Sequence, residues 1–149
     1  MKTDLLQRLE NEIHVWMCAT DSITDPVILT TYTSLLSADE RERLQRFHFE
    51  KDRHAFLVSH ALVRKVLSKY ANIEPAGWRF STGEQGRPEI VRSADIPLLR
   101  FNLTHTQGLA ACVVTRDIAC GIDAEKITRR GNPLAVARKM FATTELEDL

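Results

Sequence analysis

The sequence predicts an α+β protein in which an antiparallel sheet packs against one long helix. Residues 52–71 repeat apolar side chains at three- and four-residue steps, as the buried face of an amphipathic helix does. Short runs of β-favouring residues lie before and after this stretch, and the later runs are separated by only a few residues. Connections that short favour antiparallel pairing over helical crossovers.

The first elements follow from local signals. Residues 14–19, His-Val-Trp-Met-Cys-Ala, form an apolar run followed by turn-forming residues between Asp21 and Pro26, and they predict the first strand. Ser37 and Glu40 have the spacing of a capping box, in which each side chain bonds a backbone N–H near the other. A helix is therefore expected to begin there.

The main helix is expected from Asp52 to about Ala71. Its predicted buried face consists of Ala55, Ser59, Leu62, Val63, Val66 and Tyr70. Its basic residues mostly fall on other faces, and these are Arg53, Arg64, Lys65 and Lys69. This division predicts which side of the helix packs on the sheet.

The remaining strands complete the sheet. Residues 78–82 and 88–91 predict a hairpin, because Gly83 and Gly86 between them suit a tight connection. Three further strands are expected at residues 100–104, 109–114 and 119–125.

Composition restricts the class of protein. A chain of 149 residues suits one ordinary domain, and its 20 basic and 20 acidic residues cancel, so no overall field attracts nucleic acid or an anionic membrane. Cys18, Cys112 and Cys120 are odd in number and lack CxxC spacing, which favours reduced, buried thiols. The sequence shows neither a signal-peptide core nor an apolar run of about 20 residues, so a cytoplasmic protein is expected.

Asp123 and Glu125 are candidate metal ligands. They lie two residues apart in the run expected to be a strand, and the two-residue period of a strand places both carboxylates on one face. Mg²⁺ is commonly held by one or two carboxylates together with substrate phosphates and water. The alternative is a solvated strand face on which Lys126 neutralises part of the charge.

Other candidates could bind an anion. His105 follows the run 100–104 at an expected strand end, where it could contact a phosphate or be an ordinary loop histidine. Arg43 belongs to a cluster of arginines that can fork onto phosphate oxygens, although interleaved acidic residues also fit a solvated helix face. Arg87 lies on a turn, where backbone can approach a ligand closely.

Three short motifs follow one another along the chain: Gly86-Arg-Pro88, then Phe101-Asn-Leu-Thr-His-Thr106, then Gly121-Ile-Asp-Ala-Glu-Lys126. In order and spacing they resemble the successive motifs of the surfactin-type 4'-phosphopantetheinyl transferases. The resemblance covers the chain from about Leu36 onward. It implies transfer of 4'-phosphopantetheine from coenzyme A to a serine of an acyl or peptidyl carrier protein.

The resemblance also implies roles for single residues. Asp123 and Glu125 fall on the family's magnesium carboxylates, and together with His105 they are the candidate catalytic residues. Thr104 and His105 fall on its Ser-His phosphate contact. Arg87 matches the basic residue of its Gly-Lys/Arg-Pro turn, and Arg43 matches a basic coenzyme A contact; Glu40 stands where some members have lysine.

Members of this type are pseudo-dimers of two similar α+β halves with the cofactor between them. Residues 1–126 are then expected to form the first half, and residues 127–149 to begin the second. Thr144 and Glu147 have the spacing of a second capping box, which predicts that a helix begins at Thr144, shortly before Leu149. The chain looks truncated before the family's Trp-x-x-Lys-Glu motif.

Three hypotheses follow from this expectation. The first is a transferase whose site is incomplete in the 149-residue chain alone. The second is a fragment that binds coenzyme A or carrier protein without turnover. The third is an oligomer in which a second copy completes the site, and it ranks last because residues 1–15 lack the Asp motif of the short holo-synthase relatives.

Overall fold

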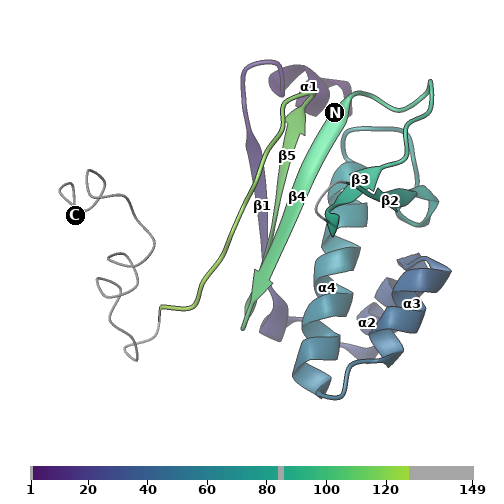
Figure 1. Cartoon of the computed structure of the whole chain (residues 1–149), viewed down its shortest axis with the longest axis vertical. Coiled ribbons are helices and arrows are strands. Elements are labelled where there is room, and N and C mark those ends of the chain that lie inside the picture. The colour runs from purple at the N-terminus through teal and green to yellow at the C-terminus, as the bar shows by residue number, and fades with distance from the viewer. Residues whose placement is uncertain (1, 84–85, 128–149) are drawn as a thin grey trace.

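The computed structural model describes residues 2–83 and 86–127. Those residues form helices and two antiparallel sheets (Figure 1), and this mixture confirms the α+β class. The elements, in chain order, are α1 (Lys2–Arg8), β1 (His14–Ala19), η1 (Thr20–Ser22), α2 (Pro26–Leu35), α3 (Ala38–Gln45), α4 (Glu50–Leu67), η2 (Pro75–Gly77), β2 (Phe80–Thr82), β3 (Pro88–Ile90), β4 (Leu99–Thr106) and β5 (Leu109–Arg116).

The larger sheet has the strand order β1-β5-β4, and all of its pairings are antiparallel. β4 and β5 form a hairpin in which Thr106 pairs with Leu109, so the turn consists of Gln107 and Gly108. Gly108 has a φ of +83°, a left-handed conformation that favours glycine. β2 and β3 form a small separate hairpin, as predicted.

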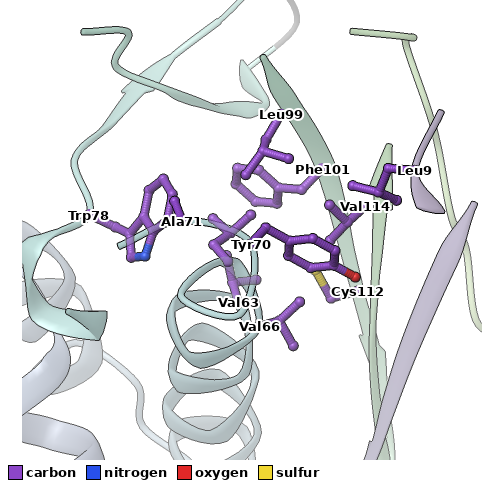
Figure 2. Packing of buried hydrophobic residues seen from close by; sticks show 11 residues of the cluster. Leu9, Val63, Val66, Tyr70, Ala71, Trp78, Leu99, Phe101, Cys112 and Val114 are labelled. Atoms are coloured by element: carbon purple, nitrogen blue, oxygen red, sulfur yellow. The ribbon is translucent and has the colours of Figure 1, made fainter. Parts of the chain in front are cut away.

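Helix α4 packs along one face of this sheet (Figure 1), which we call the inner face; the opposite one is the outer face. Figure 2 shows Val63 and Val66 of α4 and the nearby Tyr70 meeting Phe101 of β4 and Val114 of β5. All five side chains are buried. Their burial removes apolar surface from water and is the main force that fixes the helix on the sheet.

A buried ion pair ties α3 to α4. Nη2 and Nε of Arg64 donate to Oε2 of Glu40 at 2.7 and 3.1 Å, and the Arg64 side chain is 1% exposed. Nη1 of Arg64 also donates to the backbone carbonyls of Pro75 and Trp78 at 3.2 and 3.0 Å. Nδ1 of His60 lies 2.9 Å from Oε1 of Glu40. One guanidinium therefore joins α3, α4 and the chain leading into β2.

The predicted capping box is confirmed, and it uses the same carboxylate. Oγ of Ser37 accepts from the N–H of Glu40 at 3.2 Å, and Oε2 of Glu40 accepts from the N–H of Ser37 at 2.8 Å. Glu40 is thus enclosed by protein groups on both of its oxygens. Its position opposite Arg64, rather than toward solvent, gives this residue a structural task.

The long helix differs from its prediction in two ways. It ends at Leu67, because the N–H groups of Lys69 and Tyr70 bond three residues back, to the carbonyls of Val66 and Leu67 at 2.9 and 3.0 Å, and tighten the last turn. The assignment of Arg64 to a face away from the core is wrong, because this side chain is buried to neutralise Glu40. Helical spacing alone does not reveal a buried partner on another helix.

The strand predicted over residues 119–125 is wrong, since this segment has no strand pairing. Helix α2 was not predicted from the sequence: Asp25 caps it by accepting from the N–H of Val27 at 2.8 Å. The helix expected at Thr144 lies outside the described residues, as does almost all of the expected second-half segment 127–149. Within the described part of the chain, no helix combines the length and apolarity needed to cross a membrane.

We expect the change Glu40→Gln to lower the free energy of unfolding by about 3 kcal/mol, because it leaves the buried Arg64 guanidinium without a counter-charge. The matched control is Glu42→Gln on the same helix. Glu42 pairs with Arg46 in solvent, where an ion pair contributes less than about 1 kcal/mol. Urea unfolding of both variants measures the difference, and equal losses would contradict the role given to the buried pair.

Acid should weaken the fold through the same carboxyl. Burial by itself would raise the pKa of Glu40, but hydrogen bonds from His60 and Ser37 and the charge of Arg64 outweigh it and lower the pKa to about 2. The unfolded chain has the ordinary value of 4.5, so it binds the proton first as the pH falls. The contribution of Glu40, about 3 kcal/mol, is complete above pH 4.5 and is lost toward pH 2.

Unfolding measured between about pH 5 and about pH 3 tests this dependence. The stability difference between the protein and its Glu40→Gln variant should shrink as the pH falls. A difference that stays constant across this range would show that another group is responsible.

Candidate functional site

Three side chains of β4 form a row on the outer face of the sheet. Phe101 belongs to the core, so the alternation of a strand directs Arg100, Asn102 and Thr104 to the opposite face. We call these three residues the polar row. Sequence reasoning singled out Thr104 but not Arg100 or Asn102, although the two-residue period of residues 100–104 contains that information.

The segment of residues 119–126 lies along the polar row. The N–H of Ile122 donates to Oδ1 of Asn102 at 3.3 Å, and the N–H of Ala124 donates to Oγ1 of Thr104 at 3.2 Å. Both contacts join residues 20 positions apart, so the segment runs parallel to β4, as its path in Figure 1 shows. Because these N–H groups bond to side chains and not to a neighbouring backbone, the segment does not become a strand of the sheet.

Exposure agrees with this placement. Val113 and Ala111 of β5 lie on the outer face beside the polar row and are 4% and 3% exposed. Val15 and Met17 of β1 lie in the same two rows and are 52% and 69% exposed. The segment 119–126 therefore covers the outer face over β4 and β5 but leaves β1 open.

Asp123 and Glu125 share the solvent side of this segment. Ile122 and Ala124 are half-buried, whereas the two acidic residues between and after them are exposed. Oδ1 of Asp123 accepts from the hydroxyl of Thr104 at 3.4 Å and from the N–H of Ala124 at 3.0 Å. The two-residue alternation expected from the sequence is thus present, although the strand is not.

The donor set of Asp123 and Glu125 fits a hard cation. Two exposed carboxylates offer the oxygen ligands that Mg²⁺ takes, and the ion commonly completes its shell with water and substrate phosphates. In residues 2–83 and 86–127 no cluster of three or more metal-binding side chains is present. Asp123 and Glu125 are therefore the two candidate ligands of this segment.

A cavity of about 240 Å³ adjoins the upstream end of the polar row. Arg87, Arg92 and Arg100 line it together with Asn102 and Cys120. Arg92 lies 3.8 Å from a carboxylate oxygen of Asp117, and Glu89 also contributes to the wall, so the cavity is basic but not purely so. Guanidinium groups gathered around one cavity suit a phosphate or another polyanion.

His105 faces the other way. It follows Thr104 on β4, so it points to the inner side and lines a second cavity of about 360 Å³ with Lys51 and Asp52. Burial and the charge of the nearby His60 lower the pKa of His105, while Asp52 acts in the opposite sense. The lowered pKa favours the uncharged form of the imidazole.

The structure divides the predicted site residues among three places. Asp123 and Glu125 lie on the segment over the outer face, where Asp123 contacts Thr104, and Arg87 lines the basic cavity, which adjoins the polar row at Arg100 and Asn102. His105 lines the inner cavity at the same end of β4 as Thr104.

Arg43 lines neither cavity: it is exposed on α3, with its guanidinium 5.6 Å from the centre of the Phe56 ring. Lys51 and Asp52 of the inner cavity were not predicted as site residues, because nothing in their spacing connects them with His105.

Comparison with known proteins identifies the chain. Residues 25–116 match the family model described as 4'-phosphopantetheinyl transferase, N-terminal. The chain is similar to the 4'-phosphopantetheinyl transferase HetI of Nostoc sp., with 32% identity over 95% of this chain and 59% of HetI. It is similar to Sfp of Bacillus subtilis, with 34% identity over 79% of this chain and 50% of Sfp. The chain thus spans between half and three fifths of the length of these two relatives.

A solved structure shares the fold. It is a holo-(acyl-carrier-protein) synthase from Bacillus anthracis, solved in complex with CoA (3',5'-ADP), and it matches with a TM-score of 0.50 and 13% identity over 68% of this chain and 91% of that chain. At this identity the likeness concerns the arrangement of helices and strands. The family match and the two relatives decide the family, and the chain belongs to the 4'-phosphopantetheinyl transferases, whose N-terminal part it matches.

Proposed function

We propose that the protein to which this chain belongs transfers 4'-phosphopantetheine from coenzyme A to a serine of an acyl or peptidyl carrier protein. The observation that supports this most is the outer face of the sheet, where Asp123 and Glu125 lie beside Thr104 and next to a basic cavity. A pyrophosphate needs both a cation site and positively charged side chains around it. An exposed pair of carboxylates and a basic cavity, both against β4, support such a site.

Each candidate residue then has a chemical task. Asp123 and Glu125 would hold Mg²⁺, which supplies charge neutralisation on the pyrophosphate when it is bound. Arg87 and Arg100 would contact phosphate oxygens from the basic cavity. His105, whose lowered pKa favours the uncharged form, would contact coenzyme A through a hydrogen bond, and Arg43 would contribute a positive charge at a greater distance.

The transfer itself is a displacement at phosphorus. The serine oxygen of the carrier protein forms a bond to the phosphorus that bears pantetheine, its proton passes to a base, and the bond to adenosine 3',5'-bisphosphate breaks. Such a reaction depends on positioning and on stabilising charge more than on covalent help from the enzyme. The chain's own residues would orient the pyrophosphate and hold it still.

The division of the chain is part of the proposal. Residues 1–126 would form the first of two similar halves, and residues 127–149 would begin the second. Cys18, Cys112 and Cys120 are free thiols, which is typical of a reducing compartment, so we also propose that the protein works in the cytoplasm. A second candidate function is binding without turnover by the 149-residue chain, since the basic cavity is formed entirely by described residues.

Coenzyme A binding by the chain should depend on Mg²⁺ through the acidic pair. In a calorimetric titration, the double change Asp123→Asn and Glu125→Gln should remove the gain in affinity that Mg²⁺ gives, at least about tenfold. The control is Asp95→Asn, which removes an exposed carboxylate from the loop between β3 and β4. Equal Mg²⁺ dependence in the double variant and the control would contradict the metal assignment.

The basic cavity should contribute separately. We expect Arg87→Gln and Arg100→Gln each to weaken coenzyme A binding about tenfold, because each removes a charge-assisted contact to phosphate. Arg46→Gln is the matched control, because Arg46 is exposed directly after α3 and paired with Glu42. Unchanged affinity in both cavity variants would remove this cavity from the proposed site.

Transfer to an apo carrier protein decides between the two candidate functions. A fluorescent coenzyme A labels the carrier protein only if turnover occurs, and the same titrations report binding alone. Labelling by the 149-residue chain would refute the candidate of binding without turnover. Neither labelling nor binding would contradict both.

A further inference from the structure

Two side chains of the polar row accept hydrogen bonds from the segment 119–126, and the spacing of the acceptors equals the spacing of the donors. Asn102 and Thr104 are two residues apart on β4, and the N–H groups they accept belong to Ile122 and Ala124, also two residues apart. The pairing repeats with the period of extended chain, so each contact supports the same alignment.

We propose that Asn102 and Thr104 are positioning residues that fix the register of the acidic segment and thereby decide that Asp123 and Glu125 face solvent. The inference rests on the proposed function only for the metal that these carboxylates would bind. The alignment of the segment with β4 does not depend on any bound metal.

A slip by one residue would reverse the segment. Because side chains alternate with a period of two, it would turn the carboxylates toward the sheet and Ile122 toward solvent. The surface beneath is formed by Val113 and Ala111, which are apolar and buried. The slip would place a carboxylate, in place of the half-buried Ile122, against this apolar surface, and burying a charge there is costly, so this cost and the two acceptors favour the same register.

The hydroxyl of Thr104 does more than accept. It takes the N–H of Ala124 at 3.2 Å and donates its own hydrogen to Oδ1 of Asp123 at 3.4 Å. Oδ1 also accepts from the N–H of Ala124 at 3.0 Å, so one oxygen of Asp123 is held by two donors. These two hydrogen bonds fix the orientation of the Asp123 carboxylate.

Contacts at the two ends of the segment support the same path. The N–H of Asp117 donates to the carbonyl of Leu98 at 2.8 Å where the chain leaves β5. Nζ of Lys126 donates to Oε1 of Gln107 at 3.0 Å at the far end. These end contacts limit where the segment starts and stops, whereas the contacts to the polar row set the alignment of its middle.

This assignment changes the expected task of Thr104. The sequence resemblance places it on a phosphate contact, but in the structure its hydroxyl is already bonded to Ala124 and Asp123. A threonine that acts through Asp123 is a positioning residue. Asn102, which received no role from the sequence, joins it for the same reason.

The test uses the 149-residue chain and two matched pairs of variants. Asn102→Leu and Thr104→Val keep the approximate size and remove the acceptor, whereas Asn102→Asp and Thr104→Ser keep an oxygen in place. Amide hydrogen exchange measured by nuclear magnetic resonance follows Ile122 and Ala124 separately. Unchanged exchange protection of the α4 amides shows that a variant is folded.

We expect Asn102→Leu to speed exchange of the Ile122 amide about tenfold. Thr104→Val should speed exchange of the Ala124 amide by less, because Oδ1 of Asp123 still accepts from this N–H at 3.0 Å, and the oxygen-keeping variants should stay near the original rates. Mn²⁺ serves as a paramagnetic probe of the carboxylates. The concentration that broadens the Asp123 and Glu125 signals should rise about tenfold in the acceptor-free variants and return in the conservative ones.

The outcomes separate the two proposals. Unchanged exchange at Ile122 and Ala124 in the acceptor-free variants would overturn the register assignment. Faster exchange without any Mn²⁺ effect in the unaltered chain would support the register and instead contradict the metal site. Loss of Mn²⁺ binding in Asn102→Asp and Asn102→Leu alike would mean that Asn102 acts by another route, and would also overturn the assignment.

Discussion

The fold depends on one buried cation. Arg64 is 1% exposed, and it is acceptable in the interior only because Glu40 and two backbone carbonyls surround it. Arg64 belongs to α4, and its partners come from α3 and from the chain before β2. The arrangement of these elements is therefore set by the geometry of a planar guanidinium, which tolerates little displacement of its acceptors. Apolar packing holds α4 on the sheet, but the ion pair decides which elements surround it.

The arrangement of these helices determines which face of the sheet remains available to the rest of the chain. α4 occupies the inner face of the sheet, so the residues of β4 that point away from it are free to meet another part of the chain. Segment 119–126 takes that place, and the covered outer face of β5 shows how closely it lies there. The core therefore affects the outer face indirectly: packing of the inner side of β4 fixes the strand, and the fixed strand positions the ligand-binding groups on its other side.

Much of this was accessible from the sequence. Strand β1 and the capping box at Ser37 rely on interactions between near neighbours, and both were predicted at the right residues. The face of Arg64 and the strand at residues 119–125 were predicted wrongly because their partners lie 24 and 20 positions away. Helix α2 was missed because its β-branched residues disfavour a helix, yet their hydroxyls bond to its backbone carbonyls, as Thr30 does to Pro26 at 2.8 Å. Among the site residues, the alternation of Asp123 and Glu125 is a local property, whereas the separation of His105 from them depends on the pleat of β4.

That pleat has a consequence for what the surface can recognise. Thr104 and His105 are neighbours in the chain, yet they open onto different sides of one sheet, each with its own cavity nearby. A small anion can occupy one side or the other but cannot touch both. A molecule that contacts both must pass around the free edge of β4 or the end of the hairpin at Gly108, so it must be long and able to bend. The length of the ligand, in addition to its charge, would then distinguish it from smaller phosphates of similar charge.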